Sequence, residues 1–291
     1  MSFKYLNFRL IGILRTKKGT SFDNTVKAIE CAFNNGLEAV EITSNSDHWQ
    51  EVVKYFSNLR FNIGVGSVKN KGLAQRAIDL GARFFVSPGF FEEVVIEAQK
   101  NNVPIMTGVF TVTDFNKAIK YKVPQIKFFP ANASTHEELY KAIKEPFRDE
   151  FQELENNGCK IIDFNEYHKE PCRKVNSATE FYEQYLKIKN EGSSRPIVIE
   201  YPDGKKGFER LKEFSLNLSE HGIRTYAIGG INTENMREVL TSYGVYGLCP
   251  GSGMFDGQAI LEGNYEKIRS GVKKHVSIIM MNRSETFAVR N

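Results

Sequence analysis

A lysine inside an apolar run is the residue of this sequence with the clearest chemical potential. Lys127 lies in Ile126-Lys127-Phe128-Phe129-Pro130. A charged ammonium is costly to bury among such residues, so desolvation would lower its pKa and leave a neutral amine able to attack a carbonyl carbon. The alternative is an edge-strand lysine that points to solvent, and the pattern alone leaves both open.

Two further ionisable residues follow apolar runs. Glu41 lies near the end of EAVEIT at 38–43 and could move protons to or from a carbonyl or hydroxyl. Arg15 directly follows RLIGIL at 9–14 and could pair bidentately with a carboxylate. For each residue, an ordinary ion pair with a neighbouring side chain is the simpler alternative.

Eight short apolar runs would position these side chains. Each has the length of a strand, is rich in β-branched or aromatic residues and is bounded by Gly, Pro or small polar residues. Amphipathic helical patterns, such as FDNTVKAIECAFNNG at 22–36, separate the runs. This alternation predicts parallel β/α units and an α/β fold, a (β/α)8 TIM barrel, with a doubly wound open sheet as the alternative. The runs are 9–14, 38–43, 61–67, 83–87, 103–108, 125–130, 224–230 and 244–251.

In a β/α barrel, the residues at the carboxyl ends of the strands line the site. Besides the three residues above, these ends supply Ser67, Pro88 and Thr107, then the turns Gly229-Gly230 and Gly251-Ser252. Backbone N–H groups at such turns can bind an anion, and barrels often bind phosphate after strands seven and eight. Each turn alone could be a plain connection.

One connection is much longer than the others. About 94 residues separate Pro130 from Thr225, whereas a whole βαβ unit needs only ~30. The stretch contains helical patterns and the strand-like runs CKIIDF and RPIVIEY, so it is not low-complexity. We therefore predict a single barrel domain over 1–291, interrupted between strands six and seven by an ordered insertion at about 148–221.

Composition limits the classes of partner. Apolar residues make up 41% and charged residues 25% of the chain, and the net charge of +4 is well mixed, which does not indicate nucleic-acid binding. The four cysteines form no CxxC pair, which argues against a zinc site, and no run approaches the ~20 apolar residues of a membrane helix. We expect a cytoplasmic protein with a small-molecule partner, no metal and no other cofactor.

The strand ends resemble the 2-keto-3-deoxy-6-phosphogluconate (KDPG) / 4-hydroxy-2-oxoglutarate (KHG) aldolase family. The resemblance covers roughly 8–133 and 222–275. Together its segments are far more specific than any single one. They are IGILR, GLEAVEITSNS, IGVGSVKN, ARFFVSPGF, VPIMTGVFTVTD, IKFFPAN, AIGGINTENM and LCPGSGMF.

The resemblance implies a role for each matching residue. Lys127 would form the Schiff base and Glu41 would be the general acid/base. Arg15 and Ser67 would hold the pyruvyl carboxylate, and Ser67 stands where the family often has threonine. The remaining matches would shape the pocket (Asn45, Pro88, Thr107 and Phe129) or bind phosphate (Gly229, Gly230, Gly251 and Ser252).

One position departs from the phosphogluconate-type pattern. Those enzymes usually carry an arginine four residues after the glutamate, and here that position is Asn45. The stretch EITSNSDHW is closer to the E-I-x-x-N-S-x-x-W pattern of the phosphogalactonate-type branch. This departure puts phosphogluconate specificity in doubt without removing the Schiff-base chemistry.

The implied activity is that of a class I aldolase, a homotrimer that cleaves a 2-keto-3-deoxy-6-phospho sugar acid or 4-hydroxy-2-oxoglutarate to pyruvate and an aldehyde. The insertion could cap the site, alter the substrate's distal end or change the assembly. Two alternatives stay open from the residues alone. One is a phosphate-binding isomerase or synthase without imine chemistry, and the other is a non-catalytic ligand-binding barrel.

Overall fold

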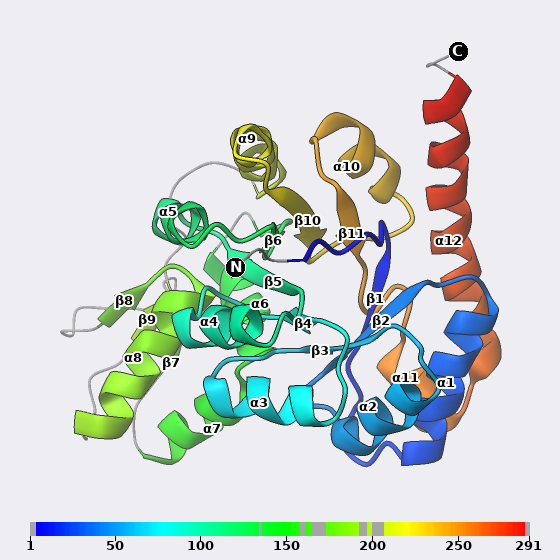
Figure 1. The fold of residues 1–291 in the computed structure, drawn as a ribbon. Helices are drawn as coiled ribbons and strands as arrows, with labels where there is room; N and C mark the ends of the chain where they lie inside the picture. Colours follow the sequence, from blue (N-terminus) through cyan, green and yellow to red (C-terminus); the bar gives the residue numbers. More distant parts are fainter. Residues whose placement is uncertain are drawn as a thin grey trace.

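The computed structural model describes residues 4–133, 136–157, 161–163, 173–191, 197–199 and 207–288. Eight parallel strands pair in the order β1-β2-β3-β4-β5-β6-β10-β11 (Figure 1). A parallel bridge between Leu10 and Leu248 joins the first strand to the last. The predicted (β/α)8 barrel is therefore confirmed. Its strands are β1 (Ile11–Leu14), β2 (Ala39–Thr43), β3 (Ile63–Gly66), β4 (Phe85–Val86), β5 (Ile105–Val109), β6 (Gln125–Phe128), β10 (Arg224–Ile228) and β11 (Gly247–Cys249).

Amphipathic helices surround the barrel because their apolar faces pack on the outer faces of the strands. Side chains cap several of them. Ser21 accepts a hydrogen bond from the Asn24 N–H at the first helix, and Thr111 and Asp114 form a reciprocal capping box at the fifth. The barrel helices are α1 (Phe22–Asn34), α2 (Trp49–Asn58), α3 (Lys71–Asp79), α4 (Glu92–Lys100), α5 (Val112–Lys120), α9 (Gly207–Glu220), α10 (Met236–Ser242), α11 (Gly257–Glu262) and α12 (Tyr265–Ala288).

The barrel interior is a packed apolar core rather than a channel. Phe84, Met106 and Tyr226 are fully buried there, and glycine leaves the room that the larger side chains need. A Cβ on Gly64, for example, would overlap the ring of Phe84. The Tyr226 hydroxyl donates to the carbonyl of Phe8, 2.8 Å away, in the segment before β1. This core forms the floor below the carboxyl ends of the strands.

Among the described residues, six elements between β6 and α9 are additional to the eight barrel units, and we call them the inserted elements. Three of their strands form a parallel sheet in the order β7-β9-β8, with helices beside it. They gather on one side of the barrel, away from α12 (Figure 1). The inserted elements are α6 (His136–Lys144), α7 (Arg148–Asn156), β7 (Ile161–Asp163), β8 (Arg173–Val175), α8 (Ala178–Glu191) and β9 (Ile197–Ile199).

Helix α9 belongs to the barrel and not to the inserted elements. It packs beside β10, and its Phe214 ring lies 5.5 Å from Phe128 on β6 and 5.4 Å from Phe115 on α5. The predicted range of about 148–221 thus includes this barrel helix and omits α6.

None of the helices in the described part of the chain has the length and apolar character needed to cross a membrane.

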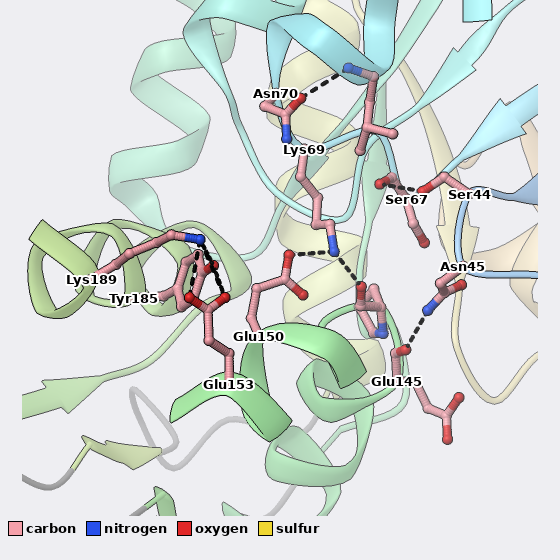
Figure 2. A network of polar contacts seen from close by, with 12 residues as sticks. Ser44, Asn45, Ser67, Lys69, Asn70, Glu145, Glu150, Glu153, Tyr185 and Lys189 are labelled. Carbon is pink, nitrogen blue, oxygen red and sulfur yellow. Dashed lines mark hydrogen bonds and ion pairs between the residues drawn. The ribbon is translucent and has the colours of Figure 1, made fainter. Parts of the chain in front are cut away.

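A buried ion pair attaches the inserted elements to the loop after β3. Lys69 Nζ lies 2.5 Å from Glu150 Oε1 of α7, and the two side chains are only 7% and 11% exposed. The same ammonium donates to the carbonyl of Pro146, 3.1 Å away (Figure 2). It also lies 5.2 Å from the centroid of the Phe147 ring. These contacts hold the α6–α7 turn against the carboxyl-end face of the barrel.

A second attachment holds α8 on the loop after β4 and on the first turn of α5. The hydroxyl of Thr179 donates to Asp114 Oδ1, 2.7 Å away, and accepts from the Phe90 N–H at 3.0 Å. All three residues are buried. These two sets of buried contacts therefore fix the inserted elements on the face where the strands end.

Loss of the Lys69 ammonium should weaken the fold strongly. Lys69→Met leaves the carboxylate of Glu150 buried without its counter-charge, and we expect the free energy of unfolding to fall by about 3–5 kcal/mol in urea titrations followed by circular dichroism. Lys69→Met combined with Glu150→Leu should recover most of this loss, because no isolated charge remains. Lys117→Met, which breaks the exposed pair with Glu183, should cost less than about 1 kcal/mol. Equal losses from the two single changes would contradict the anchoring role.

Candidate active site

Three ionisable side chains meet at the carboxyl ends of β1, β2 and β6. Lys127 and Glu41 are 6% and 1% exposed, and each interacts electrostatically with the other and with Arg15. Burial lowers the pKa of the Lys127 ammonium and raises the pKa of the Glu41 carboxyl, and these effects exceed the attraction between the two groups. The structure thus brings together an amine and a carboxyl group whose pKa values are both shifted toward the neutral form.

Glycine on the neighbouring strand makes room for the carboxyl group. A Cβ on Gly66 of β3 would overlap the carboxylate of Glu41, so the side chain can lie flat against that strand only because the position is glycine. Glu41 Oε2 is buried and has no hydrogen-bond partner among the described residues. A buried acid group with an unsatisfied oxygen is suited to exchange a proton with a bound molecule.

Lys127 is surrounded by apolar and weakly polar groups. On β6 it pairs with Gly108 of β5 on one side and with Tyr226 of β10 on the other. Its Nζ lies 4.4 Å from the centroid of the Phe129 ring. The thiol of Cys249 on β11 is also within electrostatic range, and burial raises the pKa of that thiol well above its ordinary value. Cys249 was not among the predicted site residues, and its place in an apolar strand gave no signal for it.

Arg15 is engaged by a residue from outside the eight barrel units. Its Nη1 lies 3.0 Å from Oε2 of Glu145, in the turn between α6 and α7, and the two side chains are 22% and 64% exposed. Burial is the largest influence on Arg15 and lowers its pKa, whereas the Glu145 carboxylate raises it. The guanidinium nevertheless keeps its charge, because the pKa of arginine lies far above neutrality.

Asn45 and Ser67 lie beside the same turn (Figure 2). The Nδ2 of Asn45 donates to the Glu145 carbonyl, and the Asn45 carbonyl accepts from Arg148 Nη2, both at 3.1 Å. Ser67 is buried, has a φ of 57° and accepts a hydrogen bond from the hydroxyl of Ser44 through its carbonyl. No local sequence pattern indicated Glu145 or Arg148, because both reach the site from a segment far along the chain.

Thr107 and Pro88 hold the wall of the site at β4 and β5. The Thr107 hydroxyl donates to the carbonyl of Gly89, 3.1 Å away, and both Thr107 and Pro88 are buried. Gly108 lets β5 approach this loop, because a Cβ there would overlap the Pro88 carbonyl. The Thr107 hydroxyl therefore fixes the loop after β4.

The two glycine turns lie side by side after β10 and β11. Gly229 and Gly230 have φ values of 98° and 65°, which favour glycine, and Gly230 packs against Asn132 in the loop after β6. Gly251 accepts hydrogen bonds through its carbonyl from the next turn of chain, and Ser252 is exposed. The first turn thus borders the loop that follows Lys127, and the second lies beside the end of β1, where the Ile13 N–H donates to the Pro250 carbonyl at 2.9 Å.

Comparisons with known proteins agree with this geometry. A profile of the KDPG and KHG aldolase family matches residues 5–192. The 2-dehydro-3-deoxy-phosphogluconate aldolase of Treponema pallidum is 34% identical over 85 residues, which cover 29% of this chain and 40% of that protein. The KHG/KDPG aldolase of Escherichia coli is 32% identical over 127 residues, which cover 43% of this chain and 60% of that protein. The matched region thus spans about half the length of these relatives.

A solved structure shares the fold. The KDPG aldolase of Legionella pneumophila, with pyruvate captured at low pH as a covalent carbinolamine intermediate, is 18% identical and has a TM-score of 0.56. The match covers 91% of this chain and 93% of the other.

Removal of the buried amine should stabilise the folded chain at neutral pH. The unfolded chain has a lysine pKa near 10.5 and binds a proton that folded Lys127 tends to release. Folded stability is therefore lost as the pH falls from that value through the lowered pKa. Lys127→Met removes this loss, and we expect a gain of about 0.5–2 kcal/mol in the free energy of unfolding at pH 7.

The gain should shrink as the pH approaches the ordinary lysine pKa. Lys100→Met, a change of the same kind on the exposed side of α4, should alter the free energy of unfolding by less than about 0.5 kcal/mol at either pH. A Lys127→Met protein that is less stable at pH 7 would mean that the folded chain holds this lysine charged and paired.

Proposed function

Because this chain belongs to the KDPG and KHG aldolase family, we propose that it is a class I aldolase. Its substrate would be a 2-keto-3-deoxy-6-phospho sugar acid or 4-hydroxy-2-oxoglutarate, which it would cleave to pyruvate and an aldehyde. The observation that carries the proposal is the pairing of Lys127 and Glu41, an amine and a carboxyl group that burial biases toward their neutral forms.

The first half of the reaction forms an imine. The neutral amine of Lys127 attacks the keto carbon of the substrate, and the neutral carboxyl of Glu41 gives a proton to the departing hydroxyl of the carbinolamine, which leaves as water. The product is a protonated imine beside a newly formed carboxylate. That carboxylate is attracted by the imine charge, so the site gains electrostatic stabilisation at this point of the reaction.

The second half breaks the carbon–carbon bond. The Glu41 carboxylate accepts the proton of the C4 hydroxyl, the C3–C4 bond breaks, and its electron pair moves into the imine to form an enamine. The aldehyde departs. Protonation of the enamine at C3 and hydrolysis of the imine then release pyruvate and restore the amine of Lys127.

The other predicted residues would bind the substrate. Arg15 and Ser67, at the ends of β1 and β3 on either side of β2, would hold the carboxylate of the pyruvyl portion. Pro88, Thr107, Phe129 and Asn45 would shape the pocket. Gly229, Gly230, Gly251 and Ser252 would bind a phosphate group through backbone N–H groups, because their turns follow the last two strands of the barrel.

The carbinolamine in the Legionella pneumophila aldolase supports the proposed chemistry, since pyruvate is bound covalently in that protein on the same fold. The proposal includes a homotrimeric assembly and a cytoplasmic location, both carried over from the family.

Covalent trapping tests the imine. Incubation with pyruvate and borohydride should add one reduced pyruvyl group to the peptide that contains Lys127, as measured by mass spectrometry. Lys127→Met should abolish the addition, whereas Lys100→Met should leave it intact. Phosphate binding without imine chemistry would instead give an unmodified peptide, and that result would refute the aldolase proposal.

Replacement of the acid/base group should slow catalysis with little effect on folding. We expect Glu41→Gln to lower kcat for aldol cleavage by about 10²–10⁴-fold, because the amide cannot exchange the proton that each half of the reaction requires. Slow accumulation of the trapped adduct should persist. Glu38→Gln, three residues earlier on the exposed surface, should retain the activity of the unchanged protein. A Glu41→Gln enzyme with normal kcat would exclude this residue as the proton carrier.

A further inference from the structure

The α6–α7 turn brings a carboxylate to the mouth of the site. Its backbone is held by hydrogen bonds from Asn45 to the Glu145 carbonyl and from Lys69 to the Pro146 carbonyl, both at 3.1 Å (Figure 2). The buried pair between Lys69 and Glu150 fixes the start of α7 directly after the turn. The backbone of residues 145–150 is thus held tightly against the barrel.

The Glu145 side chain is held much less tightly than its backbone. It is 64% exposed, and its carboxylate meets Arg15 with one contact of 3.0 Å. The pair is exposed at its carboxylate end, where water solvates Glu145 once it parts from Arg15, so breaking the contact costs little free energy. The side chain can therefore turn away from Arg15 without any movement of the turn that carries it.

The charges at the mouth favour an anion in this position. Burial is the main cause of the lowered pKa of Arg15, and repulsion from a second guanidinium, that of Arg148, acts in the same direction. Arg148 is fixed near the mouth by its hydrogen bond to the Asn45 carbonyl. Two adjacent cations leave a positive potential that one exposed carboxylate partly neutralises, so a second carboxylate arriving from solution would compete for the same place.

We propose that Glu145 is an internal ligand of Arg15 that the carboxylate of the incoming 2-keto acid must displace. This inference rests on the proposed function, which assigns Arg15 to the substrate carboxylate. Glu145 thereby sets the concentration of substrate at which the site fills, and it does not take part in bond making or breaking. The inserted elements supply a determinant of affinity that the eight barrel units do not contain.

Neutralisation of Glu145 tests the competition. Glu145→Gln keeps the size of the side chain and the backbone contacts of the turn but removes the negative charge. The pyruvate concentration that gives half-maximal borohydride trapping should fall about two- to fivefold, the range that an exposed ion pair accounts for. The limiting trapping rate should be unchanged. The matched control is Glu155→Gln, at an exposed position of α7, which should match the unchanged protein.

A second probe separates this inference from the proposed function. Oxamate has the shape and carboxylate of pyruvate but forms no imine, so calorimetric titration measures carboxylate binding alone. Glu145→Gln should bind oxamate more tightly by a similar factor. In an Arg15→Met background the same change should have no effect, because the cation for which the two carboxylates compete is gone.

The outcomes are distinct. Two results would overturn the inference and leave the aldolase proposal standing. In the first, trapping is normal and Glu145→Gln needs the same pyruvate concentration as Glu155→Gln for half-maximal trapping. In the second, Glu145→Gln binds more weakly than the unchanged protein. If neither the unchanged protein nor its variants are trapped while Glu145→Gln still binds oxamate more tightly, the aldolase proposal falls and the competition at Arg15 stands. If no protein is trapped and Glu145→Gln gains no affinity for oxamate, both fall.

Discussion

The site depends on the cost of burying two ionisable groups in an apolar barrel. Lys127 and Glu41 lie on strands that belong to different β/α units, and the closed barrel brings them together while it excludes water from both. Desolvation then opposes the charged form of each group more strongly than their mutual attraction favours it. The barrel provides this environment through glycines such as Gly66, which let side chains of one strand lie against the backbone of the next.

The inserted elements extend the barrel without disturbing this arrangement. The inserted elements begin after β6 and end before α9. Helix α9 packs against β6, β10 and α5 in the place of an ordinary barrel helix. Their own sheet lies outside the barrel, and their buried attachments are to the loops after β3 and β4 and to the first turn of α5. Because active-site variation in β/α barrels is concentrated in such loops, an addition here can change ligand binding and leave the strands intact.

The strands and the central residues were predictable because local patterns determine them. Apolar runs bounded by glycine and proline located all eight barrel strands, and the lysine in QIKFFP stood out from its apolar neighbours. The contacts of Glu145 and Arg148 could not be predicted, because they bridge about a hundred residues of sequence through packing that no local pattern encodes. The choice of sixth barrel helix was equally hidden, since the stretches that form α6 and α9 are both amphipathic.

The late return of the chain to the barrel has a consequence for folding during synthesis. Strand β6 pairs with β10, and about a hundred residues of chain lie between Gln125 and Arg224. At a synthesis rate of roughly 5–20 residues per second, one edge of β6 waits on the order of 10 seconds for its partner. An unpaired apolar strand edge is a template for association with other chains. The inserted elements emerge from the ribosome during this interval, so their length sets the time for which this edge of β6 stays unpaired.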